Sequence, residues 1–284
     1  MGYFKTLSKA VNEIFRSPIV LLPKILYVLF FNIFSLLLYR FGKFSDLHTL
    51  ISNLQTNVVT NLEKFEPIFK FFQNNIVHLM VSFCIFVIAT FIVGSGLMAF
   101  TYYMLAEIVK KRKFTLYNAW KKGGKYFWKI VLVRILIYLI SVLFAIFIGV
   151  LAIVAYKFTS KFYTITLASI ALVFLILGVI ILKFGLMFSY AILFLETKNP
   201  FKAIYRSFLF FKKRPMHVFY VWLVILLVNI AVALGLMIFN LFSSITIGEI
   251  SKTFVNYFMS FFALFVGIFT DVLGDLYIFL NLKS

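Results

Sequence analysis

The sequence has few acidic residues, few prolines and a single cysteine. Among 284 residues, Asp and Glu together number 9, Pro 5, His 3 and Cys 1. Cys84 alone cannot form an intramolecular disulfide, and no Cys and His spacing fits a metal site. The Gly-x-Ser-x-Gly and His-Glu-x-x-His motifs and a phosphate-binding glycine loop are also missing. We therefore expect no metal, no cofactor and no enzymatic activity.

Charged residues make up only 13% of the chain, whereas a soluble globular protein averages about 25%. Hydrophobic residues reach 63%, Phe occurs 39 times, and the mean hydropathy is +1.05. A soluble domain of this size could not bury so much apolar surface, and the same values exclude disordered, collagen-like and coiled-coil chains. The chain is therefore expected to be an integral membrane protein.

Six apolar runs are long enough to cross a bilayer, which requires about 20 residues of helix. The runs are continuously apolar rather than alternating, which favours helices over barrel strands. We predict an all-α fold with one membrane domain over residues 1–284, in the cell membrane. The six predicted spans lie near 19–39, 76–106, 128–154, 164–195, 216–242 and 254–280.

Lys and Arg number 28, which gives a net charge of +19. These residues concentrate before the first span and in the second and fourth connections, as in Lys110–Lys113 and Lys212–Arg214. Because basic residues remain on the cytoplasmic side, both termini are predicted to be cytoplasmic. The basic charge is expected to attract anionic lipids of the inner leaflet, and no motif indicates nucleic-acid binding.

The first external connection, residues 41–75, is too long for a simple turn. Its apolar residues recur at three- and four-residue steps, and Asn53, Asn57 and Asn61 share another face. This pattern predicts an amphipathic helix that ends before Pro67 and lies on the outer surface or caps the membrane helices. A partner-binding helix is the alternative. The apolar positions are Leu47, Leu50, Ile51, Leu54, Val58, Leu62 and Phe65.

A basic amphipathic stretch precedes each odd-numbered span, and the three stretches align without gaps. They open at Phe4, Phe114 and Phe201 and reach the membrane fourteen residues later, at Pro18, Trp128 and Pro215. The second and fourth spans share Gly-Leu-Met, at 96–98 and 185–187. We therefore predict three repeats of an interfacial helix plus a transmembrane hairpin, at approximately 1–107, 113–196 and 198–284.

With these repeats, the chain resembles a group of uncharacterised six-span membrane proteins of archaea and bacteria. The same kind of domain is attached to some glycerophosphodiester phosphodiesterases. The segments that carry the resemblance include Asn199-Pro200-Phe201-Lys202-Ala203-Ile204 and Arg206-Ser207-Phe208. The resemblance implies the six-span architecture. It implies no catalytic residues, because the phosphodiesterase part with its metal-binding acids is absent from this sequence.

Ionisable side chains within membrane helices are costly, so each needs an explanation. The cations Lys24 and Arg134 each lie six residues past a span start, roughly 9 Å into the membrane. The anions Glu107 and Glu196 lie at cytoplasmic helix ends, where the helix dipole disfavours them. We expect these charges to pair between helices or to reach the headgroups.

Lys183 and Asp271 lie deeper, at about 20 and 18 Å from the cytoplasmic ends of their helices. We hypothesise an ion pair between them, with Asp275 one turn closer to the cytoplasm. The alternative is a hydrated cavity, in which Lys183 holds an anionic substrate and Asp271 and Asp275 relay protons. These residues, with Lys24, Arg134, Glu107 and Glu196, form the candidate intramembrane cluster.

Two functions fit these features. The first is a non-enzymatic membrane protein that organises lipids or partner proteins, including further copies of this chain. The second is a small transporter or channel-like protein for an anionic or amphipathic solute. A cavity around Lys183 favours transport, and dry packing there favours the scaffold. The sequence alone favours the first interpretation.

Overall fold

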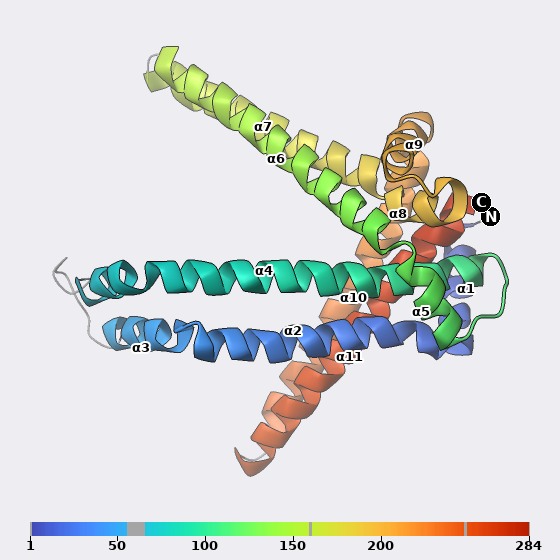
Figure 1. Ribbon diagram of the computed structural model, residues 1–284, viewed down its shortest axis with the longest axis horizontal. Coiled ribbons are helices and arrows are strands. Elements are labelled where there is room, and N and C mark those ends of the chain that lie inside the picture. The colour runs from blue at the N-terminus through green and yellow to red at the C-terminus, as the bar shows by residue number, and fades with distance from the viewer. Residues whose placement is uncertain (1, 56–65, 159–160, 247–248, 284) are drawn as a thin grey trace. The chain divides into compact units, whose positions relative to one another are not determined.

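The computed structural model describes residues 2–55, 66–158, 161–246 and 249–283. Over these ranges the chain is helical and contains no strand (Figure 1). Six described helices are long and apolar enough to cross a membrane, which confirms the predicted all-α class. The helices form two compact units. The larger unit comprises Met1–Leu22 and Ala99–Ser284, and the smaller unit comprises Pro23–Met98.

The smaller unit contains most of α2 (Leu22–Phe41), α3 (Phe44–Gln55) and the first part of α4 (Glu66–Val109). The Phe34 and Phe86 rings of α2 and α4 stack with centroids 5.7 Å apart. A tight turn joins α2 to α3. Lys43, at its end, has a φ of 61°, in the left-handed region that a side chain seldom adopts.

The predicted external segment 41–75 includes α3 and the first residues of α4. Helix α3 covers 44–55, whereas residues 56–65 lie outside the described residues, and with them Asn57, Asn61 and the three last apolar positions. Residues 66–75 belong to the span helix α4, which begins at Glu66. Pro67 is the second residue of α4, a position in the first turn where proline is well tolerated.

Two helical hairpins make up much of the larger unit (Figure 1). One pairs α6 (Phe127–Phe158) with α7 (Lys161–Leu186), and the Phe144 ring packs directly over Gly178. The other pairs α10 (Pro215–Thr246) with α11 (Glu249–Lys283). A side chain at Gly178 would displace Phe144, so this glycine permits the close approach of the two helices.

The fourth predicted span, 164–195, is not one helix. Helix α7 ends at Leu186, and α8 (Ser189–Ile192) follows after a short turn. A π-helical turn over Leu193–Thr197 then leads to Lys198, whose φ is 56°. The hydropathy of this region stays high through the break, which explains why a pattern of apolar residues could not locate it.

Three short helices precede odd-numbered spans: α1 (Tyr3–Arg16), α5 (Leu116–Gly124) and α9 (Pro200–Lys213). The Thr115 hydroxyl accepts a hydrogen bond from the Asn118 amide, and the Asn199 side chain accepts one from the Lys202 amide. These bonds satisfy amides that the first helical turn leaves unpaired, so Thr115 and Asn199 set where α5 and α9 begin.

Counting from the N-cap residues gives a register that differs from the ungapped sequence alignment. Relative to each cap, the fourth and eighth residues are small and buried in all three helices, and the second is an exposed aromatic residue. Counted from the caps, Tyr117 takes the position of Phe4 and Phe201, whereas the sequence alignment matched Phe114 to them. The two counts differ because α5 is about one turn shorter than α1 and α9. The buried residues are Thr6 and Ala10, Ala119 and Gly123, and Ala203 and Ser207.

Each short helix packs on an even-numbered span helix of the larger unit. Helix α5 approaches the α4 backbone so closely that a Cβ on Gly123 would lie 3.2 Å from Phe100 Cα. Helix α9 places the Phe208 ring directly over Gly185 of α7. Helix α1 packs on α11, where the Tyr277 hydroxyl donates to the Tyr3 carbonyl at 3.4 Å. Small residues therefore set the separation at two of the three contacts.

We expect Gly123→Val to lower the free energy of unfolding by about 1–3 kcal/mol, because its side chain would meet the α4 backbone. Gly124→Val is the matched control: it makes the same change one residue later, where a Cβ meets nothing within 4 Å. Thermal unfolding of both variants in one uncharged detergent measures the difference. Equal melting temperatures would contradict close packing of α5 on α4.

Candidate functional site

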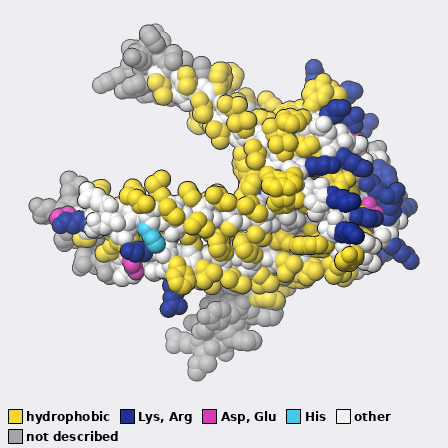
Figure 2. Space-filling view, in the orientation of Figure 1, with side chains coloured by type: hydrophobic (Ala, Val, Ile, Leu, Met, Phe, Trp, Pro, Cys, Tyr) yellow, Lys and Arg dark blue, Asp and Glu magenta, His cyan; other side chains and the backbone are white. Residues whose placement is uncertain are grey.

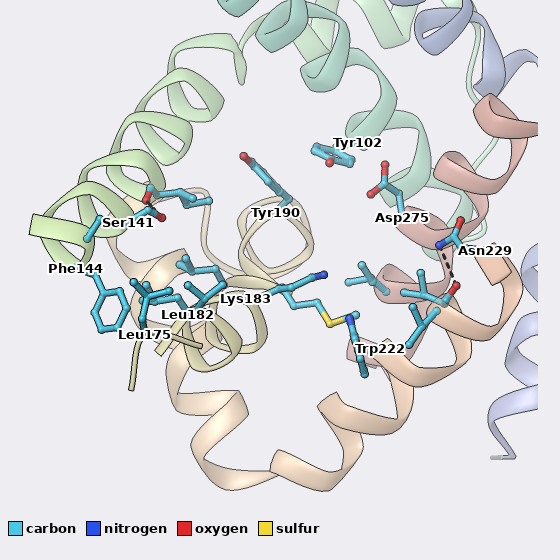
Figure 3. Close-up of a pocket in the computed structure, with 18 residues that line it drawn as sticks. Tyr102, Ser141, Phe144, Leu175, Leu182, Lys183, Tyr190, Trp222, Asn229 and Asp275 are labelled. Atoms are coloured by element: carbon cyan, nitrogen blue, oxygen red, sulfur yellow. Dashed lines mark hydrogen bonds between the residues drawn. The ribbon is translucent and has the colours of Figure 1, made fainter. Parts of the chain in front are cut away.

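An open-sided cavity of about 720 Å³ lies within the larger unit (Figure 3). Side chains of α4, α6, α7, α10 and α11 line it, together with the short α8 segment. Its volume is within the range of small-molecule sites, about 300–1,000 Å³. Most of the wall is apolar, and the polar lining residues are Tyr102, Ser141, Lys183, Tyr190, Asn229 and Asp275.

Aromatic and charged groups gather at one end of this cavity. The Tyr102 and Tyr190 rings stack with centroids 5.0 Å apart, and Phe279 lies on Tyr102 at 5.7 Å. In Figure 3 the Lys183 ammonium points into the cavity from α7, and the Asp275 carboxylate lies across the same space on α11. The cavity thus combines one cation and one carboxylate with two phenol groups.

The Lys183 side chain is exposed to the cavity rather than packed against an acid. Its Nζ atom lies 5.8 Å from the centre of the Trp222 ring, a cation–π distance. Among the described residues it forms no ion pair within 4.0 Å. A ring face compensates a cation less well than a carboxylate does, so the ammonium can still accept an anionic partner.

The Lys183–Asp271 ion pair stays a prediction, and the structure does not place Asp271 in the lining of the Lys183 cavity. It places Lys183 in one cavity with Asp275, a helical turn farther along α11. The prediction counted the depth of Lys183 along a straight helix to Glu196. Because α7 ends at Leu186, Lys183 lies only three residues from a helix end.

The apolar part of the cavity extends away from Lys183 along two helices. On α7 the lining runs back from Lys183 to Leu175, about 12 Å of helix. On α10 it runs from Trp222 to Asn229, about 10 Å. The cavity is therefore charged at one end and mostly apolar along its length, with Ser141 and Asn229 as polar exceptions, which suits an amphipathic molecule.

Two other residues of the predicted cluster lie near this charged end. Arg134 is half-buried on α6 and interacts electrostatically with both Tyr102 and Tyr190. Asp271 is exposed on α11, and its charge also acts on Tyr102. Lys24 lies in the smaller unit, half-buried in the first turn of α2.

Glu196 and Glu107 lie apart from the cavity, in different surroundings. Glu196 pairs with Arg206 of α9 at 3.3 Å, where both side chains are about half exposed. From the sequence we expected Glu196 to pair with a cation of a membrane span, such as Arg134. It pairs instead with Arg206, because the chain turns back at Lys198 and places α9 beside Glu196. Glu107 is only 8% exposed, near the end of α4, and interacts with Tyr103.

The groups around Glu107 have shifted pKa values. Burial lowers the pKa of Lys110, although the Glu107 carboxylate opposes this shift. Burial raises the pKa of Tyr126, and Glu107 adds to the increase. The Lys110 Nζ atom donates to the Phe194 carbonyl at 3.3 Å, so it connects the end of α4 to the π-helical turn. These contacts are characteristic of a structural charge.

Sequence analysis identified Lys183 and Asp275 but missed the aromatic residues that surround them. Tyr102, Tyr190 and Trp222 were not distinguished because aromatic residues make up 20% of the chain. Asn229 and Ser141 carried a usable signal, since polar side chains within long apolar runs often mark a binding site or a helix contact.

The two glutamates should respond differently to truncation. We expect Glu107→Ala to destabilise the protein by about 1–3 kcal/mol, because it empties a buried position and removes a hydrogen bond to the half-buried Tyr103. Glu196→Ala should cost less than about 1 kcal/mol, since its ion pair with Arg206 is exposed to solvent. Thermal unfolding in one detergent compares them, and a larger loss for Glu196→Ala would contradict these assignments.

Comparisons with protein-family models, curated proteins and solved structures found no match to this chain. The resemblance to the six-span proteins of archaea and bacteria therefore stays a prediction from sequence.

Proposed function

We propose that this protein is a non-enzymatic, multi-pass membrane protein that binds an anionic, amphipathic molecule of lipid type in the Lys183 cavity. The observation that carries the proposal is one cation at the end of an apolar cavity that extends about 12 Å along α7. By holding such molecules, the protein would organise lipids at the membrane. Lys183 binds the anionic group, and the α7 and α10 side chains surround the hydrocarbon.

The two ends of the cavity match the two ends of an amphipathic anion in polarity. Burying an acyl chain against the Leu175 end stabilises the complex by about 0.8 kcal/mol per methylene that leaves water. An anionic headgroup at Lys183 gains charge-assisted hydrogen bonds. A small hydrophilic anion would leave the apolar wall uncovered, and a neutral hydrocarbon would leave the ammonium without an anion. A lipid-like anion satisfies both ends.

The proposed orientation places both termini in the cytoplasm of a cell. Lys and Arg side chains gather at the end of the larger unit where α5 and α9 lie (Figure 2). The common small-residue register of α1, α5 and α9 supports three repeats, each beginning with a helix at the inner leaflet. Anionic lipids of that leaflet are the proposed partners.

A second candidate function is transport of the same class of molecule. It is favoured by the cavity around Lys183, the feature expected of a transporter, and by the ionisable lining, where Asp275 can exchange a proton while Lys183 holds an anion. In liposomes, the protein would then accelerate the movement of a fluorescent anionic lysolipid between leaflets, and Lys183→Met would abolish the acceleration. No acceleration by the wild type would leave lipid binding as the function.

Native mass spectrometry tests the binding proposal with a defined probe, palmitoyl-lysophosphatidylglycerol. We expect the wild type to retain this lysolipid and Lys183→Met to bind it about tenfold more weakly, because a charged hydrogen bond is lost. Lys202→Met is the matched control, since Lys202 is exposed on α9 and does not line the cavity. Equal retention by all three proteins would contradict the proposal.

The apolar end needs a separate test that leaves the charge intact. Leu175→Trp fills the cavity where the acyl chain would lie, whereas Leu172→Trp adds the same bulk at an exposed position on α7 outside the cavity. We expect only Leu175→Trp to reduce lysolipid retention, by about tenfold for the displaced methylenes. A loss that is equal in both variants would argue against an acyl site.

The orientation can be measured with single cysteines in a Cys84→Ala background. A membrane-impermeant maleimide added outside intact cells should label Thr49→Cys on α3 and not Ser8→Cys on α1. Both positions are exposed, so accessibility in the folded chain is matched. Labelling of Ser8→Cys from outside would place the N-terminus outside the cell and contradict the proposed orientation.

A further inference from the structure

A second cavity, of about 920 Å³, lies in the larger unit between α1 and the loop that joins α4 to α5. It is separate from the Lys183 cavity and shares none of its lining residues. Its apolar lining comes from Pro18, Ile19, Ile108 and Phe114. We call this cavity the basic groove. Its positive charge comes from Lys9, Arg16, Lys111, Arg112 and Lys113.

The charges of the basic groove are poorly compensated. Five cations line it with a single acid, Glu13. Among the described residues, none of the five cations forms an ion pair within 4.0 Å, and neither does Glu13. Like charges at this density repel each other, so an anion that contacts several of them is favoured.

The backbone on both sides of the groove has a defined conformation. In the loop, the Arg112 amide donates to the Glu107 carbonyl at 2.9 Å, and the Lys111 amide donates to the Ile108 carbonyl at 2.9 Å. On the other side, the Ser17 amide donates to the Glu13 carbonyl at 3.1 Å at the end of α1. The cations are therefore carried by a preformed frame, which reduces the entropy cost of binding an anion.

We propose that the basic groove binds a phosphate-bearing anion. Two guanidinium groups can each hold phosphate oxygens in a bidentate manner, and the three ammonium groups add charge. The phosphate can belong to an anionic phospholipid headgroup or to a free phosphate compound. The lipid source is favoured by an apolar groove of about 310 Å³ lined by Phe15, Phe262 and Phe269, which also contacts Pro18. This inference does not depend on ligand binding at Lys183.

The test compares two variants with the same loss of charge. Arg16→Gln/Arg112→Gln alters the basic groove, and Lys122→Gln/Lys125→Gln alters exposed residues of the neighbouring α5 region. One arm titrates inorganic pyrophosphate into detergent-solubilised protein by calorimetry. The other arm counts phosphatidylglycerol molecules retained by native mass spectrometry after release from nanodiscs.

We expect the groove variant to bind at least one of the two probes about tenfold more weakly, with the control variant close to wild type. Loss confined to pyrophosphate indicates a free phosphate compound, and loss confined to phosphatidylglycerol indicates a lipid headgroup. Equal losses in both variants, or no loss in either arm, would overturn the site. Equal losses would show that binding follows overall charge.

Two further variants keep the test decisive. Lys111→Gln/Lys113→Gln removes two exposed cations from the loop, so it reports on the groove if the arginine variant fails to fold. It should weaken binding of the same probe. Lys183→Met should leave pyrophosphate binding unchanged, because a small hydrophilic anion does not fill the apolar cavity, and this separates the groove from the proposed lysolipid site.

Discussion

Close packing of the short helices against the span helices is the interaction on which the larger unit depends. In lipid there is little hydrophobic drive between helices, so small residues that allow backbones to approach supply much of the association. Gly123 permits the contact of α5 with α4, and Gly185 permits the contact of α9 with α7. The second contact lies two residues beyond Lys183, so it bears directly on where that ammonium is held.

The hydrogen bonds at this end of the unit join segments that are distant in sequence. His217 of α10 bonds to the Tyr3 hydroxyl at 3.1 Å and to the Asn281 carbonyl at 3.4 Å. Lys283 donates to the Val109 carbonyl at 3.4 Å. The chain ends are thereby tied to α4 and α10. The bond from Lys283 to Val109 joins α11 to α4. These two helices also carry Asp275 and Tyr102, which line the charged end of the Lys183 cavity.

The sequence was informative wherever hydropathy or a rare charge carried the signal. Six apolar helices follow from run length, and Lys183 stands out because a lysine interrupts an apolar run. The break after Leu186 carries no proline and no charge, so hydropathy passed through it. The depth of Lys183 was counted along one straight helix for that reason, although α7 ends at Leu186. The aromatic lining was hidden by the abundance of such residues.

The central claim is that the Lys183 cavity holds an anionic, lipid-like molecule. Cryo-electron microscopy of the protein in nanodiscs made from its native lipids tests this directly. The account predicts elongated density in the cavity, with its head within hydrogen-bond distance of Lys183 Nζ and its tail extending towards Leu175. A cavity filled by repacked side chains, or one that holds only water, would contradict it.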